Sequence, residues 1–385
     1  MSKILVTGAT GRLGANVVRA LLERGDEVRC LVMPNDPAAK KLDRLDVEIV
    51  EADLRDTERL QEAVRGVDKV AHFAAIMDVR PAGMSLVEYF DINTRASFAL
   101  ADAAQANGVE KFLYTSTTAV YDTGTLTVVP TPEDVELRPN ADYGVTKVAS
   151  EAALMALAYR YDLPTIIHRP SYIMACDQVL VFGKPGPVIG SLKAAATDPH
   201  SATYTPDLGE PWKDLEEKAR ANPDLSLIPY GPAAQPLSAV AASRGSTGSP
   251  RPELVEGRSC GSPGRDSRQV SRARQAELVP WQWHVTDVRD CVQAALLSLD
   301  NTTIERDIFT IAGPPPANFE EVVTYKCSKL GTPYEEVHTA VTWRLDFDIS
   351  KARELLGYSP EYDVFRMIDD AIAFRNGEDI GVIPA

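Results

Sequence analysis

The first 25 residues contain the feature that most restricts the fold of this chain. An apolar run at residues 3–6 ends at Thr-Gly-Ala-Thr-Gly-Arg-Leu-Gly, residues 7–14, and apolar residues then recur at helical spacing until Gly25. This pattern predicts a strand, a glycine-rich turn and a helix. Glycines let the backbone approach a pyrophosphate closely, and the helix start offers unpaired amide groups to the anion. A tight turn without a ligand is the alternative, but the flanking strand and helix favour a dinucleotide site.

The alternation of strand and helix continues along the first half of the chain. Further strands are expected at residues 27–33, 47–51, 68–73, 111–115, 163–169 and 308–311, and long helices at residues 86–106 and 143–160. This alternation is typical of a doubly wound, Rossmann-like parallel sheet in an α/β protein. After Pro170 it breaks down, and the later part of the chain is predicted to have helices at residues 211–221, within 281–299, and at 346–356 and 364–374.

The break after Pro170 suggests two domains. Residues 1–169, together with roughly 284–312, are expected to form the dinucleotide-binding domain, and residues 170–283 and 313–385 a smaller, irregular C-terminal substrate-binding lobe. Within this lobe, residues 242–276 are rich in serine, glycine, proline and arginine and poor in apolar residues, which predicts a disordered insertion. The segment also resembles translated bacterial palindromic repeats; a basic tether for a partner is the alternative.

Charge and cysteine pattern exclude several classes of partner. The formal net charge of -15 argues against nucleic acid and against anionic membranes, since both favour basic surfaces. The five cysteines are scattered and include no Cys-x-x-Cys pair, which argues against a disulfide framework or a metal site and favours a cytoplasmic location. The sequence shows no signal peptide and no apolar run long enough to span a bilayer. We therefore expect a small-molecule substrate.

Tyr143 and Lys147 are the first candidates for catalysis. They stand four residues apart in a predicted helix, so both side chains project from one face. A free tyrosine ionises near pH ~10, and a neighbouring ammonium group lowers the pKa of the phenol toward the range needed for proton transfer. Such pairs also occur on ordinary solvated helices. Upstream, however, a predicted strand ends in the hydroxyls of Thr117 and Thr118, at the sheet edge where open α/β folds bind ligands. A hydroxyl there can hold a carbonyl oxygen while the phenol transfers its proton.

The cofactor preference stays open from the sequence. Val32 and Met33 occupy the end of the second strand, where an acid favours NAD and an arginine favours NADP. Arg12, Lys40 and Lys41 can meet a phosphate, although solvated surface charge is the alternative for each.

Four further residues near the predicted cofactor site can be interpreted from their positions in the sequence. Asp53 can accept a hydrogen bond from an adenine amine or cap a helix. His72 is interpreted as a packed histidine, and the small residue Ala74 nearby lets a flat cofactor lie close. Tyr172 is expected at the pocket entrance, with plain packing as the alternative.

Taken together, these motifs make the chain resemble the extended short-chain dehydrogenases/reductases, which include NAD-dependent epimerases and dehydratases, dihydroflavonol-type reductases and 3β-hydroxysteroid dehydrogenases. The resemblance rests on TGATGRLG at 7–14, ADL at 52–54, HFAA at 72–75, Asn93, YTSTTAVY at 114–121, YGVTK at 143–147, HRP at 168–170 and HVTDV at 284–288. It implies that Tyr143 is the general acid/base, that Lys147 holds the nicotinamide ribose and lowers the pKa of the phenol, and that Thr117 helps to hold the substrate oxygen. The implied site for NAD or NADP comprises Gly8, Thr10, Gly11, Arg12, Leu13, Gly14, Asp53, Leu54, Ala74, Tyr143 and Lys147.

The resemblance also ranks the possible functions. The leading hypothesis is an NAD(P)-dependent oxidoreductase that acts on a secondary alcohol or ketone, with Thr118 and Tyr172 near the substrate. A nucleotide-sugar epimerase with retained NAD is the alternative, and a non-catalytic dinucleotide sensor is a third possibility. Dehydration is disfavoured because Thr118 and Ala119 stand where 4,6-dehydratases carry an acidic pair. A homodimer is implied, formed through the helices at residues 86–106 and 143–160.

Overall fold

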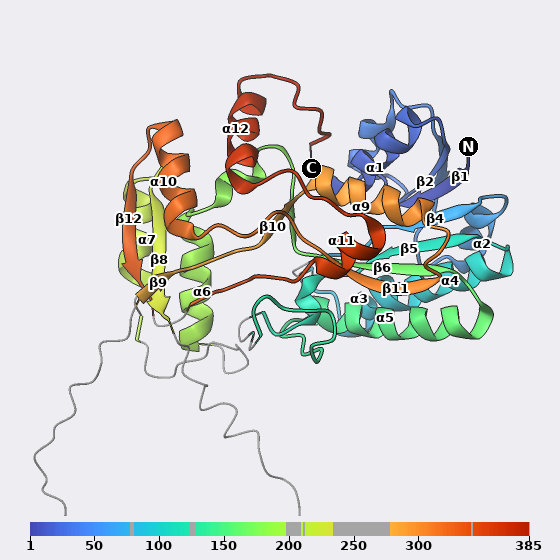
Figure 1. Ribbon diagram of the computed structural model, residues 1–385, viewed down its shortest axis with the longest axis horizontal. Helices are drawn as coiled ribbons and strands as arrows, with labels where there is room; N and C mark the ends of the chain where they lie inside the picture. Colours follow the sequence, from blue (N-terminus) through green and yellow to red (C-terminus); the bar gives the residue numbers. More distant parts are fainter. Residues whose placement is uncertain are drawn as a thin grey trace, which may run out of the picture.

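The structure is a computed structural model of the 385-residue chain, and it describes residues 1–77, 81–123, 126, 128–197, 209–210, 212–233, 278–339 and 342–384. The predicted insertion at residues 242–276 lies outside the described residues. The described part forms a large sheet domain and a smaller lobe, seen side by side in Figure 1.

A seven-stranded parallel sheet forms the centre of the larger part, with the strand order β11-β6-β5-β4-β1-β2-β3. The strands are β1 (Lys3–Thr7), β2 (Glu27–Val32), β3 (Glu48–Glu51), β4 (Lys69–His72), β5 (Lys111–Thr115), β6 (Thr165–Pro170) and β11 (Arg306–Ile311). The order reverses between β1 and β4, the position at which doubly wound sheets bind ligands. Ile4, Leu5 and Val6 are fully buried because helices cover both faces of the sheet. The predicted Rossmann-like fold is confirmed.

Two layers of helices enclose this sheet. One apolar cluster joins α1 (Arg12–Glu23) and α9 (Val288–Asp300) to one face, and a second joins α2 (Thr57–Val64), α4 (Ala96–Ala106) and α5 (Asp142–Tyr161) to the other. The single helix predicted at residues 86–106 is instead three consecutive segments, α3 (Leu86–Phe90), a π-helical turn at Asp91–Arg95 and α4. The π turn contains the buried Asn93, whose contacts are described with the site below.

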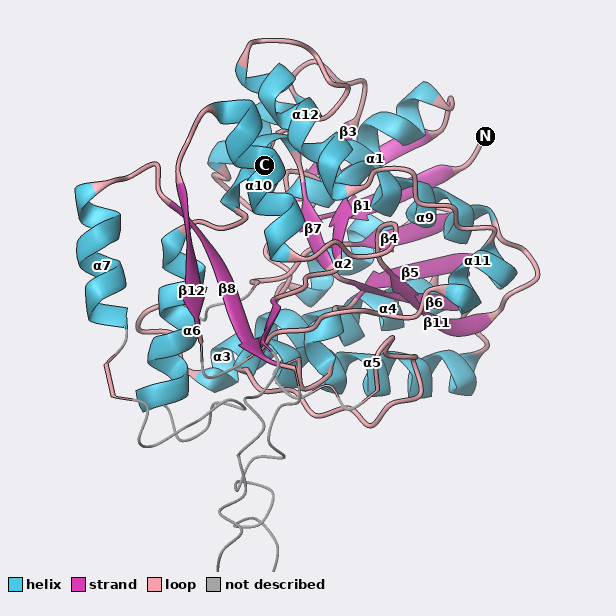
Figure 2. Ribbon diagram, turned by 60° about the vertical axis from the view of Figure 1, so that its left-hand side comes forward, coloured by secondary structure: helices cyan, strands magenta, loops and turns pink. Residues whose placement is uncertain are grey.

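The smaller lobe is more regular than the sequence indicates. Its strands are β7 (Tyr172–Met174), β8 (Ser226–Pro232), β9 (Leu278–Pro280), β10 (Val285–Asp287) and β12 (Tyr334–His338), and its helices are α6 (Pro185–Thr197), α7 (Trp212–Ala221), α10 (Phe319–Leu330), α11 (Ser350–Leu356) and α12 (Val364–Arg375). β7 pairs with β10, and β8 lies between β12 and β9 in a separate sheet (Figure 2). α11 packs beside β11 of the main sheet, while α6, α7 and α10 surround the small sheet.

Two expectations for this lobe are wrong. Only one helix was expected between residues 170 and 241, whereas α6 and β8 also form there. Prolines and glycines in the first turns of α6 weaken its local helix signal, and its apolar residues are buried against α7, while β8 pairs with β12. The helix expected from Asp346 begins at Ser350. Residues 345–348 are held extended instead, since Leu345 N donates to Gln282 O at 2.9 Å and Asp348 N donates to Thr131 O at 2.9 Å.

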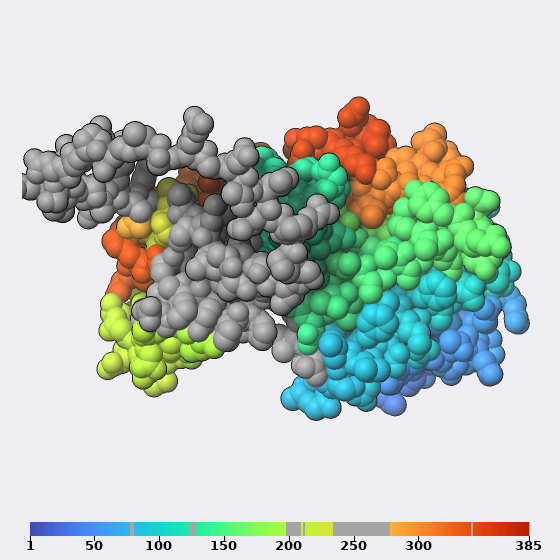
Figure 3. All heavy atoms as spheres, turned by 90° about the horizontal axis from the view of Figure 1, so that it is seen from below, coloured from blue at the N-terminus to red at the C-terminus, as the bar shows by residue number. Residues whose placement is uncertain are grey.

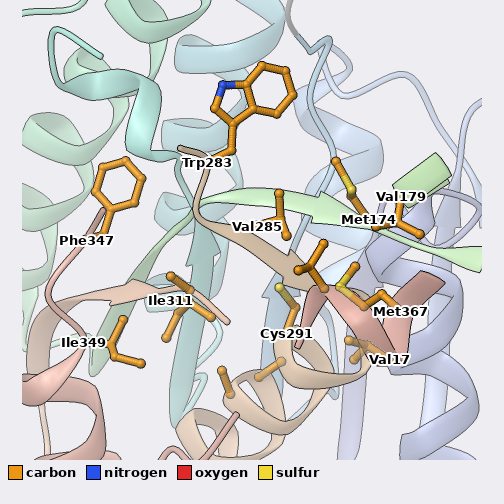
Figure 4. Packing of buried hydrophobic residues seen from close by; sticks show 14 of the residues in the cluster. Val17, Met174, Val179, Trp283, Val285, Cys291, Ile311, Phe347, Ile349 and Met367 are labelled. Carbon is orange, nitrogen blue, oxygen red and sulfur yellow. The ribbon is translucent and has the colours of Figure 1, made fainter. Parts of the chain in front are cut away.

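One apolar core is continuous between the two parts. Figure 4 shows Val17 of α1, Cys291 of α9, Met174 of β7 and Met367 of α12 packed around Val285 of β10. β7 and β10 are therefore packed against α1, the helix that follows the glycine-rich turn.

Candidate active site

The turn between β1 and α1 can be built only with glycine at two positions. Gly8 has φ +66°, and a Cβ atom there would lie 2.7 Å from Ala74 N. A Cβ atom on Gly14 would lie 2.0 Å from Gly8 O. Gly11 N donates to Gly8 O at 2.9 Å, and no side chain caps the start of α1. The turn thus exposes backbone close to the first amide groups of α1, the arrangement that suits a pyrophosphate.

Asp36 reaches this turn from the loop after β2. Its Oδ2 accepts a 2.6 Å hydrogen bond from Thr10 Oγ1, and Lys41 Nζ donates to Thr10 O at 3.0 Å. Asn35 has φ +61°, and this left-handed residue turns the chain back toward the glycine-rich turn. The sequence interpretation looked for an acid only at Val32 and Met33, so it missed Asp36.

Four other predicted cofactor residues make contacts with different parts of the protein. Arg12 donates from Nη1 to Ile173 O on β7, and Leu13 packs in the core, so both residues join the turn to the smaller lobe. Ala74 N donates to Thr7 Oγ1 at 3.3 Å and lies against Gly8. Leu54 packs at the edge of the second apolar cluster.

Asp53 is bound by a neighbouring arginine. Arg55 donates to its two carboxylate oxygens at 3.0 and 2.6 Å, and these bonds hold the pKa of Asp53 below its usual value. Asp56 rather than Asp53 caps α2, so the helix-cap alternative for Asp53 is wrong.

Lys147 is buried at the carboxyl edge of the sheet. Its Nζ donates to Thr115 O at 2.7 Å and to Tyr114 OH at 3.1 Å, and it lies 5.7 Å from the centre of the Tyr143 ring. Burial lowers the pKa of Lys147 to about 7, and the nearby Glu151 opposes this shift. The amine is therefore held beside the phenol, as the four-residue spacing predicts.

The first turn of α5 lies against the segment that carries Thr117. A Cβ atom on Gly144 would lie 2.3 Å from Ala119 O, so only glycine permits this close approach. Thr117 Oγ1 accepts a hydrogen bond from Ala119 N at 3.1 Å, at the start of the 3-10 turn Thr118–Val120. Tyr143 precedes Gly144 and is thereby brought to the same edge as Thr117.

Two hydroxyl groups at this edge have no protein partner. Thr115 Oγ1 and Ser116 Oγ are buried without a hydrogen bond, although buried hydroxyls are nearly always bonded. The glycine-rich turn and the uncapped start of α1 leave backbone amide groups for an anion. The residues present therefore fit a bound dinucleotide.

Asn93 is hydrogen-bonded to the first turns of α5. Its Oδ1 accepts from Ile76 N at 2.9 Å, and its Nδ2 donates to Thr146 Oγ1 at 3.2 Å. Thr146 Oγ1 in turn donates to Tyr143 O at 2.7 Å. The π-helical turn thus fixes the backbone of the residue expected to transfer the proton.

His72 is a packed histidine, as expected. It lies within 2.6 Å of Thr7 Oγ1 and 2.8 Å of Ser97 Oγ, and burial lowers its pKa to about 3. The ring is therefore neutral near pH 7.

The predicted substrate residues differ in exposure. Thr118 is buried in the 3-10 turn. Tyr172 is half-exposed on β7, and its ring stacks on Trp283 at a centroid distance of 5.4 Å. Among the described residues there is no cluster suited to a metal ion, Cys30, Cys176, Cys291 and Cys327 are free, and no helix is long and apolar enough to cross a bilayer.

Sequence comparison connects this site to a known family. Residues 4–176 match the NAD dependent epimerase/dehydratase family. The first half of this chain is therefore similar to members of that family. The matched region begins in β1 and ends after β7, so it includes the glycine-rich turn, Thr117, Tyr143 and Lys147.

Curated relatives match slightly less than half of this chain. The chain is 36% identical over 176 residues to sterol demethylase protein B of Methylococcus capsulatus, covering 44% of this chain and 51% of the relative. It is 33% identical over 192 residues to a 3-beta-hydroxysteroid dehydrogenase of Mycolicibacterium neoaurum, covering 48% and 51%. It is 30% identical over 190 residues to a UDP-glucose 4-epimerase of Azospirillum brasilense, covering 48% and 53%. The match thus spans about half the length of these relatives.

Solved structures show the same fold over nearly the whole chain. A short-chain dehydrogenase/reductase superfamily protein from Agrobacterium tumefaciens with bound NAD superposes with a TM-score of 0.71 at 23% identity, covering 97% of each chain. UDP-glucuronic acid 4-epimerase from Bacillus cereus in complex with NAD gives a TM-score of 0.64 at 18% identity, covering 97% of this chain and 99% of that one.

A buried ion pair behind the family motifs was missed by the sequence interpretation. Arg169 of β6 donates to Glu151 of α5 through Nε at 3.0 Å and Nη2 at 2.7 Å, and its Nη1 donates to Tyr121 OH at 2.8 Å. Glu151 follows Lys147 by one helical turn, and this spacing was the sequence signal that could have placed Glu151 near the site. The pair ties α5 to the end of β6 and to the segment after Thr117.

Proposed function

We propose that this chain is an NAD-dependent oxidoreductase that moves a hydride between the nicotinamide and a secondary alcohol or ketone of a small molecule. The observation that carries the proposal is the buried Lys147, which is held beside the ring of Tyr143. Both lie at the carboxyl edge of the sheet, where β1 leads into the glycine-rich turn. The family match supports a role as an enzyme, and NAD-bound neighbours of the same fold support the cofactor.

The protein residues supply binding and proton transfer. When bound, NAD would supply the hydride chemistry. The hydroxyls of Thr117 and Tyr143 hold the substrate oxygen, and the Tyr143 phenol gives or takes its proton. The ammonium form of Lys147 stabilises the phenolate, which lowers the energy of the proton transfer. With a pKa of about 7, Lys147 is close to its own titration near neutral pH.

Asp36 favours NAD over NADP. Its carboxylate lies against Thr10 in the glycine-rich turn, where it can accept a hydrogen bond from a ribose hydroxyl and would repel a 2'-phosphate. Lys41 donates to the backbone carbonyl of the same residue, Thr10, and its positive charge weakens this repulsion. The preference therefore depends on two opposed charges at one turn.

Replacing Tyr143 by phenylalanine tests the catalytic assignment. The Tyr143→Phe protein is expected to bind NAD but to lose at least about a hundredfold in turnover, because the proton donor is removed. A variant that turns over every substrate of the parent protein normally would contradict the assignment. The epimerase alternative predicts stoichiometric NAD released on denaturation together with no net reduction of added cofactor.

We also propose a homodimer through the exposed faces of α4 and α5. The exposed residues of α5 include an apolar stripe at helical spacing, Val145, Ala152, Ala156 and Tyr159, and Phe98 is exposed on α4. Figure 3 shows α5 in green beside α4 in cyan on one face of the molecule. An apolar stripe on a surface helix supports a protein interface. The division into residues 1–169 with 284–312 and a separate substrate lobe stays a prediction, as does a cytoplasmic location.

A further inference from the structure

The segment that follows α12 returns to the first helix of the sheet domain. Residues 379–384, here called the strap, lie along α1 (Figure 1). Arg19 Nη2 donates to Gly381 O. Asn16 binds both backbone groups of Ile383, since its Oδ1 accepts from Ile383 N at 2.8 Å and its Nδ2 donates to Ile383 O at 3.0 Å. Because Asn16 lies about one turn before Arg19, the strap runs toward the start of α1.

Asn16 also binds the first turn of α1. Its Nδ2 donates a second hydrogen bond, to Arg12 O at 2.8 Å, and Arg12 is the first residue of the helix. Asn16 is 3% exposed, and both N–H groups and the oxygen of its side chain are used in these bonds. A buried amide group that loses such partners costs free energy, so this side chain fixes the strap to the first turn.

A buried apolar contact fixes the strap at the same place. Val382 is 7% exposed and forms a cluster with Ala175, Cys176 and Val288. Leu13, the second residue of α1, packs against this cluster. The strap is therefore held to the first turn of α1 by hydrogen bonds and by apolar packing, and each kind of contact can be removed separately.

The backbone amide groups that suit a pyrophosphate belong to this same first turn. A binding element that is already ordered loses less conformational freedom when its ligand binds. We propose that the strap holds the first turn of α1 in the conformation that binds the cofactor, and that Asn16 is a positioning residue for NAD that acts through the backbone of Arg12. This inference rests on the NAD site of the proposed function. Thermodynamic linkage makes it reciprocal, because bound NAD must hold the strap to α1 by the same factor by which the strap tightens NAD binding.

Calorimetric titration of the full, cofactor-free chain with NAD tests the inference. Asn16→Leu removes the hydrogen bonds and Val382→Asp places a charge in the apolar cluster, so each variant should release the strap and raise the dissociation constant of NAD by about tenfold. Leu100→Ala is the control, because it opens a cavity at a fully buried residue of α4 on the other face of the sheet. A loss of stability alone leaves the NAD site intact, so the control should change the dissociation constant by less than about twofold.

Hydrogen exchange measured by mass spectrometry tests the linkage in the unaltered chain. Saturating NAD should slow exchange of a peptide that contains residues 379–384 by about tenfold. A peptide that contains the Thr339 amide, which donates to Tyr230 O at 2.6 Å in the small sheet, should exchange at an unchanged rate. This measurement needs no variant, so it decides the inference even if circular dichroism shows that Asn16→Leu and Val382→Asp do not fold.

The outcomes separate this inference from the proposed function. It is overturned if the folded variants bind NAD as tightly as the parent chain, if Leu100→Ala weakens binding equally, or if NAD leaves exchange of the strap unchanged. Failure of the parent chain to bind NAD would contradict the proposed function instead.

Discussion

Replacing Glu151 by glutamine leaves the buried Arg169 without its counter-ion. Both side chains are only 4% exposed, so water cannot solvate the remaining guanidinium group. Removing one member of a buried ion pair costs about 3–5 kcal/mol. Arg169 keeps its hydrogen bonds to Tyr121 OH and to Glu133 O at 2.8 and 2.9 Å, and the amide oxygen of glutamine can keep one more. We therefore expect a loss near the lower limit, about 3 kcal/mol.

Urea unfolding followed by tryptophan fluorescence measures this loss. Glu62→Gln is the matched control, because Glu62 pairs with Arg59 on α2 while both side chains are about half exposed. An exposed pair contributes roughly 0–1 kcal/mol, so the control should unfold almost like the parent protein. Equal stabilities of the Glu151→Gln and Glu62→Gln proteins would refute the reasoning.

A double replacement separates the charge effect from a packing effect. In Glu151→Met/Arg169→Met no unpaired charge remains buried, so this protein should be more stable than Glu151→Gln. If it is less stable, the hydrogen bonds of Arg169 rather than its charge dominate.

Glu151 also raises the pKa of Lys147. Its loss should therefore reduce turnover more at pH 8 than at pH 6, because the ammonium form is lost at a lower pH.

Three other perturbations have defined outcomes. Asp36→Asn keeps an acceptor for Ala38 N but removes the negative charge, so the ratio of NAD affinity to NADP affinity should fall by about tenfold. Titration of cofactor-free protein measures this ratio, and Asp43→Asn, an exposed position after the same loop, should leave it unchanged. Burial raises the pKa of Asp290 from 3.8 to about 6, so stability present below pH 3.8 is lost as the pH rises to about 6. Asp290→Asn should remove this pH dependence, a change of roughly 3 kcal/mol in the free energy of unfolding. Unfolding free energies of parent and variant that change in parallel with pH would contradict this prediction. Val145→Arg should halve the mass seen by light scattering if the α4 and α5 faces form a dimer; an unchanged dimer mass would contradict the proposed interface.

The smaller lobe shows where sequence patterns fail. α6 went unpredicted because the prolines and glycines of its first turns weaken the local helix signal, although Val188, Ile189, Leu192 and Ala195 follow the helical spacing. β8 forms by pairing with β12, which lies about a hundred residues later in the chain. Residues 345–348 resemble the start of a helix, but hydrogen bonds to Gln282 and Thr131 hold them extended. These partners lie far away in the sequence, so local preference could not reveal them.

The site shows the same division between local and distant information. The sequence alone determined the glycine-rich turn, the alternation of strands and helices, and the spacing of Tyr143 and Lys147, because backbone geometry fixes the periods of strands and helices. Tertiary structure decided that Asp36 reaches Thr10, that Glu151 pairs with Arg169, and that Tyr172 stacks on Trp283. These contacts join side chains from separate elements, and only the packing of those elements brings them within reach.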